Sequence, residues 1–390
     1  MKHILKIYPV ENGDTTLIKL DDNTTIQIDC KLRVGAEDPD DDSKFDVKAD
    51  LLKEVLNNGK YPFINTFILT HPDKDHCHGF GNHFYQGDPK DYKKANLENN
   101  EIVINELWVT SILFTTDQSE DANAVRNEAN RRIKLWDSND ATKDQPGNRI
   151  VLVGYDANGK FKNVPNYVPG TKVTKFDGNS TINFEAFIHA PFKDDLVTCK
   201  AEGDRNSASI ILQLVFKNEI LEEVAHVLIG GDADHYNWKE VLHQSKIHGN
   251  LSALQFDIFL APHHCSWTYF NDTPYDNDEN KVAKTYSIEI LQHQKDGAYI
   301  VASSRKIVNA KPNPPHYAAM TEYVSQLKTK ANFINTAIHP SENAPEPIVF
   351  VIDSYGISLA ESDTEKKKKI AAALAVASTS VIKKPYCSNE

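Results

Sequence analysis

The segment from Thr70 to Gly79 holds side chains that are suited to binding metal ions. It reads Thr-His-Pro-Asp-Lys-Asp-His-Cys-His-Gly and directly follows the apolar run Phe67-Ile68-Leu69. Three histidines and two aspartates fall within eight positions, and imidazole and carboxylate groups are common ligands of hydrolytic metal ions. We therefore expect part of a metal centre where this strand ends.

Two later segments place the same kinds of side chain after predicted strands. The apolar segment 224–229 leads into Gly230-Gly231-Asp232, and the segment 257–261 leads into Pro262-His263-His264. Strand ends are where rigid scaffolds usually hold functional groups. We therefore expect these two segments to meet the first one at a single site.

The side chains in these segments are numerous enough for two metal ions. The predicted metal ligands are His71, Asp73, Asp75, His76, Asp232, His263 and His264. Asp232 is predicted to bridge two ions about 3.5–4 Å apart, because the glycines before it let the backbone pass close to them. The sequence leaves open which of His263 and His264 binds metal. His78 and Asp234 are expected either to orient ligands or to bind metal directly.

Strands dominate the elements that must position these groups, and helices are interspersed. Strands are predicted near residues 3–8, 15–20, 24–29, 63–69, 107–110, 150–153, 172–176, 182–188, 207–216, 224–229, 257–261, 299–303, 348–352 and 356–359, and helices near 46–58, 119–136, 280–294 and 316–330. This order favours an α/β fold with two facing sheets covered by helices. One hydrolase domain is predicted over residues 1–360, with insertions near 81–105 and 115–150.

Residues 361–390 form a Lys/Ala-rich tail whose composition differs from that of the rest of the chain. Glu365 is followed by four lysines, and residues 370–377 are rich in alanine, which favours a helix. We expect a helical or flexible appendage through which a protein partner could dock.

The composition restricts the class of protein. Of the 390 residues 40% are apolar, and the formal net charge of −12 argues against a surface that binds polyanions throughout. A local basic groove is still allowed, and Arg126, Arg131, Arg132 and Lys134 are its candidates, with a solvated helix face as the alternative. The five cysteines include no CxxC pair, which favours a reducing compartment and hence the cytoplasm. No apolar run approaches the ~18–20 residues that cross a bilayer, so no membrane association is expected.

Together these motifs resemble the metallo-β-lactamase superfamily, and within it the branch of the soluble domain of the DNA-uptake channel protein ComEC. The superfamily's His-x-His-x-Asp-His motif corresponds to residues 71–76, in which Asp73 replaces the second histidine, as is typical of this branch. The other matching elements, in family order, are Glu11-Asn12-Gly13-Asp14-Thr15, Asp29, Asn206-Ser207-Ala208-Ser209, Gly231-Asp232-Ala233, Pro262-His263-His264-Cys265-Ser266 and His316.

The resemblance implies a four-layer αββα sandwich and two bound divalent metal ions, zinc or manganese. It also implies hydrolysis of a phosphodiester, in which Asp75 orients the attacking water and Asp232 bridges the ions. His316 would contact the substrate phosphate or protonate the leaving group, and the alternative is that it is an ordinary loop residue. Nucleic acid is the leading substrate, and Trp108 or Trp267 is expected to stack a base.

Two departures from the family pattern affect the predicted metal site. Cys265 stands where the family has glycine, so the turn after the histidine pair is expected to differ. The family's histidine before the long strand has no counterpart, since Asp204, Arg205 and Asn206 occupy that region. One ion is therefore expected to be held more weakly, and the carboxylate-rich ligand set favours manganese.

Two other functions are compatible with the sequence. A small-molecule phosphodiesterase would act on a phosphocholine-like or cyclic-nucleotide substrate, and the insertions at 81–105 and 115–150 would cover its pocket. A regulatory binding module would instead keep weakened metal sites without turnover.

Overall fold

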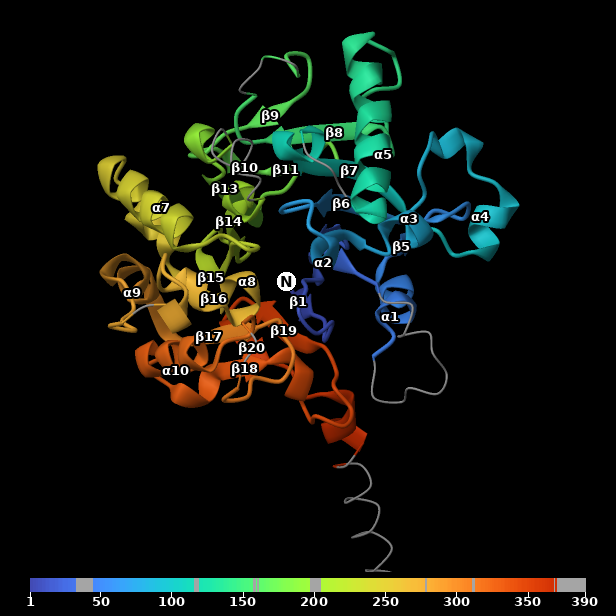
Figure 1. Ribbon diagram of the computed structural model, residues 1–390. Coiled ribbons are helices and arrows are strands. Elements are labelled where there is room, and N and C mark those ends of the chain that lie inside the picture. The colour runs from blue at the N-terminus through green and yellow to red at the C-terminus, as the bar shows by residue number, and fades with distance from the viewer. Residues whose placement is uncertain are drawn as a thin grey trace, which may run out of the picture.

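The computed structural model shows a mixed α/β protein built around two large β-sheets (Figure 1). It describes residues 1–32, 45–115, 119–156, 159, 161–196, 205–277, 279–310, 313–367 and 369. Asp204 and residues 370–390 lie outside the described residues, so the predictions for that aspartate and for most of the tail fall there. Residues 363–367 begin the tail as a helix.

The first sheet combines an antiparallel half with a parallel half. In order its strands are β20 (Gly356–Leu359), β19 (Ile348–Asp353), β1 (His3–Ile7), β2 (Thr16–Lys19), β3 (Thr25–Ile28), β6 (Pro62–Ile68), β7 (Val103–Thr110), β8 (Arg149–Val153) and β9 (Asn166–Tyr167), and β5 (Leu56–Asn57) pairs with β6. β3 and β6 run parallel, so the residues that follow them lie at the same edge of the sheet. Asp29 and the segment from Thr70 onward therefore meet there.

The second sheet also combines antiparallel and parallel strands. In order its strands are β10 (Lys172–Val173), β13 (Phe184–Ala190), β14 (Ile211–Lys217), β15 (Glu223–Ile229), β16 (Phe256–Leu260), β17 (Gln294–Ala302) and β18 (Phe333–Asn335). β15, β16 and β17 are parallel neighbours, which brings the loops after them to one edge. Short strands also form at β4 (Cys30–Lys31) and in the hairpin of β11 (Lys175–Phe176) and β12 (Asn179–Ser180).

Helices lie on two opposite sides of the molecule. The α-helices are α1 (Val47–Glu54), α2 (Lys74–Cys77), α3 (Phe80–His83), α4 (Lys94–Glu98), α5 (Glu120–Asp137), α7 (His235–Ile247), α8 (Pro262–Cys265), α9 (Thr285–Leu291) and α10 (Tyr317–Gln326). Short 3₁₀ helices occur at Pro89–Asp91, Ser111–Phe114, Asn206–Ala208, Leu251–Leu254, Trp267–Tyr269, Tyr275–Asn277, Lys330–Asn332 and Thr336–Ile338. α1 and α5 lie on one side, and α7, α9 and α10 lie on the other (Figure 1).

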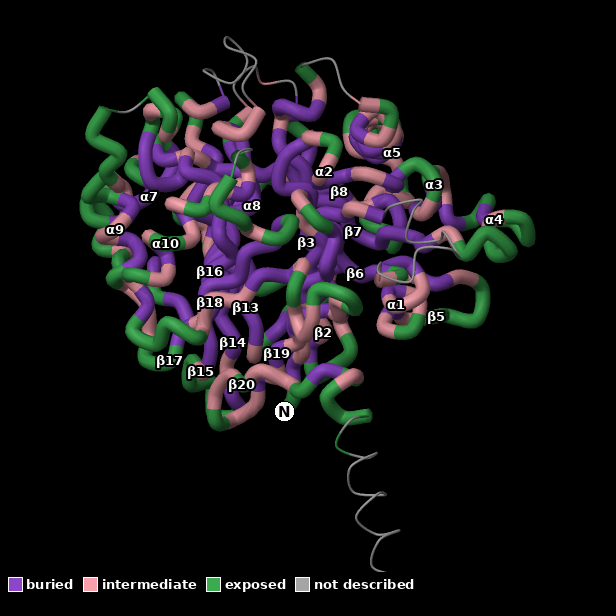
Figure 2. The backbone as a smooth tube through the Cα atoms, turned by 60° about the horizontal axis from the view of Figure 1, so that its bottom comes forward, coloured by how far each residue is buried: buried purple, intermediate pink, exposed green. Residues whose placement is uncertain are grey.

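Three apolar clusters hold the elements together. One cluster contains residues of both sheets, such as Trp108 of β7 and Leu212 of β14. A second joins the first sheet to α1 and α5, and a third joins the second sheet to α7 and α10. The strands are therefore buried on both faces, which explains their continuous apolar sequences. Figure 2 shows buried residues concentrated in the strands and exposed residues on helices such as α4 and α9.

Most predicted elements are confirmed, and the errors are local. The predicted helix 280–294 begins only at Thr285, and residues from Gln294 onward form β17 instead. The insertion 81–105 contains most of α3, α4 and the start of β7. No described helix has the length and hydropathy that a membrane crossing requires.

Helix α7 was not predicted, and it explains the position of Asp234. The Asp234 carboxylate accepts hydrogen bonds from the backbone N–H groups of Tyr236 and Asn237, which are donors at the start of the helix. Trp238 and Val241 lie on the buried face of α7 and anchor it to the second sheet. Asp234 thus caps a helix, which is a structural role that the sequence did not assign to it.

The buried imidazole of His189 on β13 makes stability depend on pH. Its Nε2–H donates to the carbonyl of Ala253 at 2.8 Å, and burial lowers the pKa of the ring to about 4. The unfolded chain binds a proton near pH 6.5, so stability falls as the pH drops from about 6.5 toward 4. At pH 5 this loss is roughly 2 kcal/mol relative to neutral pH.

We predict that His189→Gln removes this part of the acid sensitivity. Urea unfolding at pH 7.5 and pH 5 measures it, with variant His243→Gln at an exposed position as control. The same pH dependence in wild type and in His189→Gln would contradict the neutral, buried state of this ring.

Candidate metal centre

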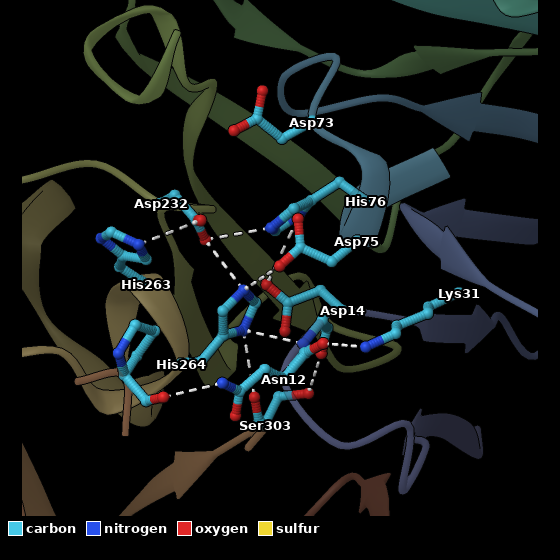
Figure 3. A network of polar contacts seen from close by, with 12 residues as sticks. Asn12, Asp14, Lys31, Asp73, Asp75, His76, Asp232, His263, His264 and Ser303 are labelled. Atoms are coloured by element: carbon cyan, nitrogen blue, oxygen red, sulfur yellow. Dashed lines mark hydrogen bonds and ion pairs between the residues drawn. The ribbon is translucent and has the colours of Figure 1, made fainter. Parts of the chain in front are cut away.

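The predicted ligands meet where the strand ends of the two sheets face each other. α2 follows β6 of the first sheet, whereas Asp232 and α8 follow β15 and β16 of the second. Figure 3 shows the side chains of α2 and α8 pointing toward one another around Asp232. The sequence prediction that three separate strand ends form one site is therefore consistent with the structure.

The carboxylate of Asp232 is the point on which the histidines converge. It is 3% exposed, and its Oδ1 lies 3.0 Å from Nε2 of His76 and 3.4 Å from Nε2 of His264. Its Oδ2 lies 3.6 Å from Nε2 of His263 and 3.7 Å from Nε2 of His71. His263 and His264, which are neighbours in the chain, thus approach different oxygens of Asp232.

Several of these converging atoms are buried without a hydrogen-bond partner. They are Nε2 of His71, His76 and His264, and Oδ1 of Asp232. The short approach of His76 to Asp232 does not have hydrogen-bond geometry. A buried polar atom left unpaired costs about 1–3 kcal/mol, so a group of them at one point needs a common partner. Metal ions bound by imidazole and carboxylate groups, one on each side of Asp232, would satisfy them.

Four residues form the tightest potential ligand set, which we call the primary cluster. Asp14, His76, Asp232 and His264 each offer one ligand atom, and these atoms lie within 4.8 Å of one another. Asp75 borders the cluster, with Oδ2 3.2 Å from Nε2 of His264. Two imidazoles with carboxylates fit zinc or manganese.

The remaining predicted ligands, His71, Asp73 and His263, surround the other oxygen of Asp232 more loosely, and we call them the secondary set. Nε2 of His71 lies 4.0 Å from Oδ2 of Asp73. The guanidinium Nε of Arg205 lies 3.1 Å from Oδ1 of Asp73, which places a positive charge beside this set. The wider spacing and the nearby cation both favour weaker metal binding than in the primary cluster.

The buried carboxylate of Asp29 orients the imidazole of His76. Oδ2 of Asp29 lies 2.8 Å from Nδ1 of His76, and Asp29 also accepts from the backbone N–H (2.7 Å) and the hydroxyl (2.6 Å) of Thr70. With Nδ1 held in this way, Nε2 of His76 faces Asp232. Nδ1 of His264 lies 3.1 Å from both the carbonyl oxygen of Ser303 and the backbone nitrogen of Gly13, which hold that ring in place.

The protonation of the site reflects the same convergence. Burial alone would lower the pKa of His76, but the charges of Asp232 and Asp29 raise it well above its usual value. Burial alone would raise the pKa of Asp232, but His264 and His76 hold it well below its usual range. Burial lowers the pKa of His71, which keeps that imidazole neutral and able to bind metal. Without a metal ion, a proton on the imidazole of His76 balances the negative charge of Asp232. A bound divalent ion would neutralise that carboxylate instead.

The backbone of α8 adopts a costly conformation to present its histidines. His263, His264 and Cys265 have φ angles of 49°, 53° and 67°, which is the left-handed region. Such a conformation costs about 1–3 kcal/mol for each non-glycine residue and persists only where surrounding contacts impose it. Cys265 thus takes a left-handed conformation that glycine adopts more readily.

Other predicted residues have structural surroundings. Nδ1 of His316 accepts from the N–H of Ala318 and caps α10, while its ring packs 4.6 Å from that of Tyr275. Nδ1 of His78 lies 3.2 Å from Oδ2 of Asp121 on α5, which ties α2 to that helix.

Several of the side chains predicted to bind nucleic acid are buried or paired, which corrects the expectation for those residues. Arg131 and Arg132 both pair with Glu128, and Arg132 is 1% exposed. Trp108 lies in the apolar cluster between strands of both sheets, and Trp267 is 2% exposed. Arg132 and the two tryptophans are therefore not part of a surface on which a polymer binds, whereas Arg126 is half-buried and Lys134 is exposed.

Two residues of the site were missed as functional groups. Asp14 belongs to the Gly-Asp element of the family pattern but was not predicted as a ligand, and its N–H donates to the carbonyl of Asp75 at 3.3 Å. Arg205 was noted only as a replacement for a missing histidine. The signal for Asp14 was its place in that element, whereas nothing in the sequence pointed to Arg205.

A scan against protein-family models finds no matching family, and a search of curated proteins finds no significant similarity. The geometry of the side chains around Asp232 is thus the main support for a metal centre in this chain.

The difference between the two ligand sets predicts two unequal metal affinities. His264→Ala should weaken the tighter ion by more than the about 10–100-fold that loss of a merely orienting partner costs. His263→Ala should leave the tighter ion bound and reduce binding of the second. Equilibrium dialysis followed by metal analysis measures both stoichiometries. Equal losses in the two variants would contradict the separation into primary cluster and secondary set.

Substitutions at two glycines distinguish the effect of backbone strain from the effect of disrupting the metal centre. Gly231 (φ +50°) and Gly249 (φ +70°) are both left-handed, but a Cβ on Gly231 would lie 2.8 Å from Oγ1 of Thr70, whereas one on Gly249 meets nothing within 4 Å. Gly249→Ala should cost about 1 kcal/mol of stability and leave metal affinity unchanged.

We predict that Gly231→Ala costs about 1–3 kcal/mol more and also weakens metal binding, because Thr70 supports Asp29. Thermal unfolding and metal titration of both variants test this. Unchanged metal affinity in Gly231→Ala would show that the Thr70 contact does not support the centre.

Proposed function

We propose that this chain is a metal-dependent hydrolase of phosphodiesters with two divalent metal ions, zinc or manganese, as cofactors. The observation that carries the proposal is the convergence of unpaired, buried Nε2 atoms of His71, His76 and His264 on the carboxylate of Asp232. A structural role alone does not account for so many unpaired polar atoms at one point.

We further propose that the fold is the four-layer αββα sandwich of the metallo-β-lactamase superfamily, in its ComEC-like branch. The apolar cluster shared by both sheets and the separate clusters under the helices on each side support this architecture. The order of the motifs along the chain supports the branch, as does Asp73 in place of the second histidine.

The residues of the site have distinct roles in the proposed reaction. Asp232 would bridge the two ions, one held by the primary cluster and one by the secondary set. When bound, such ions lower the pKa of water and polarise a phosphoryl oxygen. Asp75 would orient the attacking water, since its carboxylate lies beside His264 and stays ionised: burial would raise its pKa, but His264 and His76 lower it. Arg205 beside Asp73 would stabilise negative charge on the phosphate.

A short diester suits the site better than a long duplex. Arg131 and Arg132 of α5 are engaged with Glu128, Arg126 donates to Asn123, and the net charge of −12 would repel a long polyanion. A nucleotide diester or a short single strand avoids both difficulties. A phosphocholine-like diester is an alternative substrate that is similarly small.

The proposed reaction predicts that the chain cleaves bis-p-nitrophenyl phosphate in the presence of Mn²⁺. Asp75→Ala should reduce kcat by at least about 100-fold, because the residue that orients the water is lost. Release of p-nitrophenolate at steady state measures the rate. Asp296→Ala, at a carboxylate that is 95% exposed, is the matched control and should keep the wild-type rate. Equal rates in Asp75→Ala and wild type would falsify the assignment.

A further inference from the structure

A pocket of about 490 Å³ lies beside the candidate metal centre. It is lined by Tyr275, Asp276, Asn309, Asn313, His316 and Tyr317, together with small apolar residues. Its walls thus combine aromatic rings with amide groups. Pockets of this size bind small organic groups, and a few polar groups in them fix the orientation of the ligand.

The pocket is connected to the metal centre through a short chain of contacts. Nδ1 of His263 lies 3.2 Å from Oγ1 of Thr268, which donates to Oγ of Ser266 at 3.0 Å. The hydroxyl of Ser266 in turn donates to Oδ1 of Asn313 at 3.1 Å. The N–H of His316 also donates to the carbonyl of Cys265. The pocket therefore adjoins the loop that carries both histidines of α8.

A second connection comes from the loop of Asp14. Nδ2 of Asn12 donates to the carbonyl of Pro314 at 2.8 Å, and Oδ1 of Asn12 accepts from the N–H of Arg305. The loop that carries Asn313 and His316 is thus fastened to both sides of the primary cluster. The pocket is therefore tied to the loops that carry Asp14 and His264 of the primary cluster.

The polar groups of the pocket suit the edge of an uncharged ring. Nδ1 of His316 accepts from the N–H of Ala318, so in the neutral ring Nε2 carries the hydrogen and can donate. Oδ1 of Asn313 accepts from Ser266, which leaves the amide NH₂ group of Asn313 as the donor for a ligand. The carbonyl and ring-nitrogen acceptors of nucleobases match such donors.

The charges at the pocket disfavour a quaternary ammonium group. Nζ of Lys281 lies 4.7 Å from the centroid of the Tyr275 ring, where an ammonium ligand would bind in an aromatic cage. A second cation would be repelled there. Asp276 adds one carboxylate to the lining of the pocket, and an uncharged ring tolerates both of these charges.

From these contacts we propose that the pocket binds the planar base of a nucleotide whose phosphate reaches the metal centre. This inference rests on the proposed function and names its substrate class. Tyr317, which is 40% exposed, would stack on the base, while His316 and Asn313 would donate hydrogen bonds to its edge. The buried Trp108 and Trp267 take no part in this stacking.

Thymidine 5′-monophosphate and phosphocholine serve as the two probes, because both are phosphate monoesters, one carrying a deoxyribose with a planar base and the other a choline group. Calorimetric titration of the full-length, manganese-loaded protein should show thymidine 5′-monophosphate binding about 5- to 150-fold more tightly, as expected for one stacked base. Equal or tighter binding of phosphocholine overturns the inference.

Variants at Tyr317 assign the selectivity to the pocket. Tyr317→Ala should reduce the affinity for thymidine 5′-monophosphate to that of phosphocholine, and Tyr317→Phe should keep it, because the ring is retained. Tyr355→Ala, at a 99% exposed tyrosine in the turn between β19 and β20, is the control and should bind like wild type. Equal weakening of both probes in Tyr317→Ala contradicts base recognition.

The two proposals fail in different ways. Hydrolysis of bis-p-nitrophenyl phosphate without selectivity for the thymidine probe overturns the base pocket only. Selective binding of the thymidine probe without any hydrolysis contradicts the proposed activity only. Titration with the dinucleotides thymidylyl-thymidine and uridylyl-uridine then assigns the preferred base to DNA or to RNA.

Discussion

The structure depends on the burial of one charged carboxylate, that of Asp232. A buried charge must be balanced, and here the imidazoles of His76 and His264, one from each of two strand ends, provide the balance at Oδ1, while His71 and His263 lie beside Oδ2. Each sheet contributes one of these strand ends, so the centre also joins the two sheets. Loss of the Asp232 charge would leave several buried imidazoles without a counter-charge.

The loops around this carboxylate are held in conformations that a folded chain rarely tolerates. Asp29 and the three residues His263–Cys265 are left-handed although none is glycine. Asp29 fixes Thr70 and His76 at once, so its conformation positions two neighbours of Asp232. Strain of this kind is typical of functional sites, where it is balanced by the surrounding packing. The strain and the unpaired nitrogens thus point to the same site independently.

The sequence predicted the main ligands because they are dense in histidine and aspartate and follow apolar strands. It could not predict Asp14 as a ligand, since a single aspartate in a turn resembles many other turn residues. It also could not show that Arg132 faces inward, because the long aliphatic part of arginine packs in a core when Glu128 balances its charge. Burial of Trp108 likewise depends on how the two sheets pack, which local patterns do not encode.

Anomalous diffraction from crystals grown with zinc or manganese tests the central claim most directly. The account predicts a strong peak at the metal absorption edge within about 2.0–2.2 Å of Nε2 of His76, Nε2 of His264 and Oδ1 of Asp232. A weaker second peak should lie between His71 and His263. No peak in the primary cluster, with these imidazoles still paired to the carboxylates, would contradict the account.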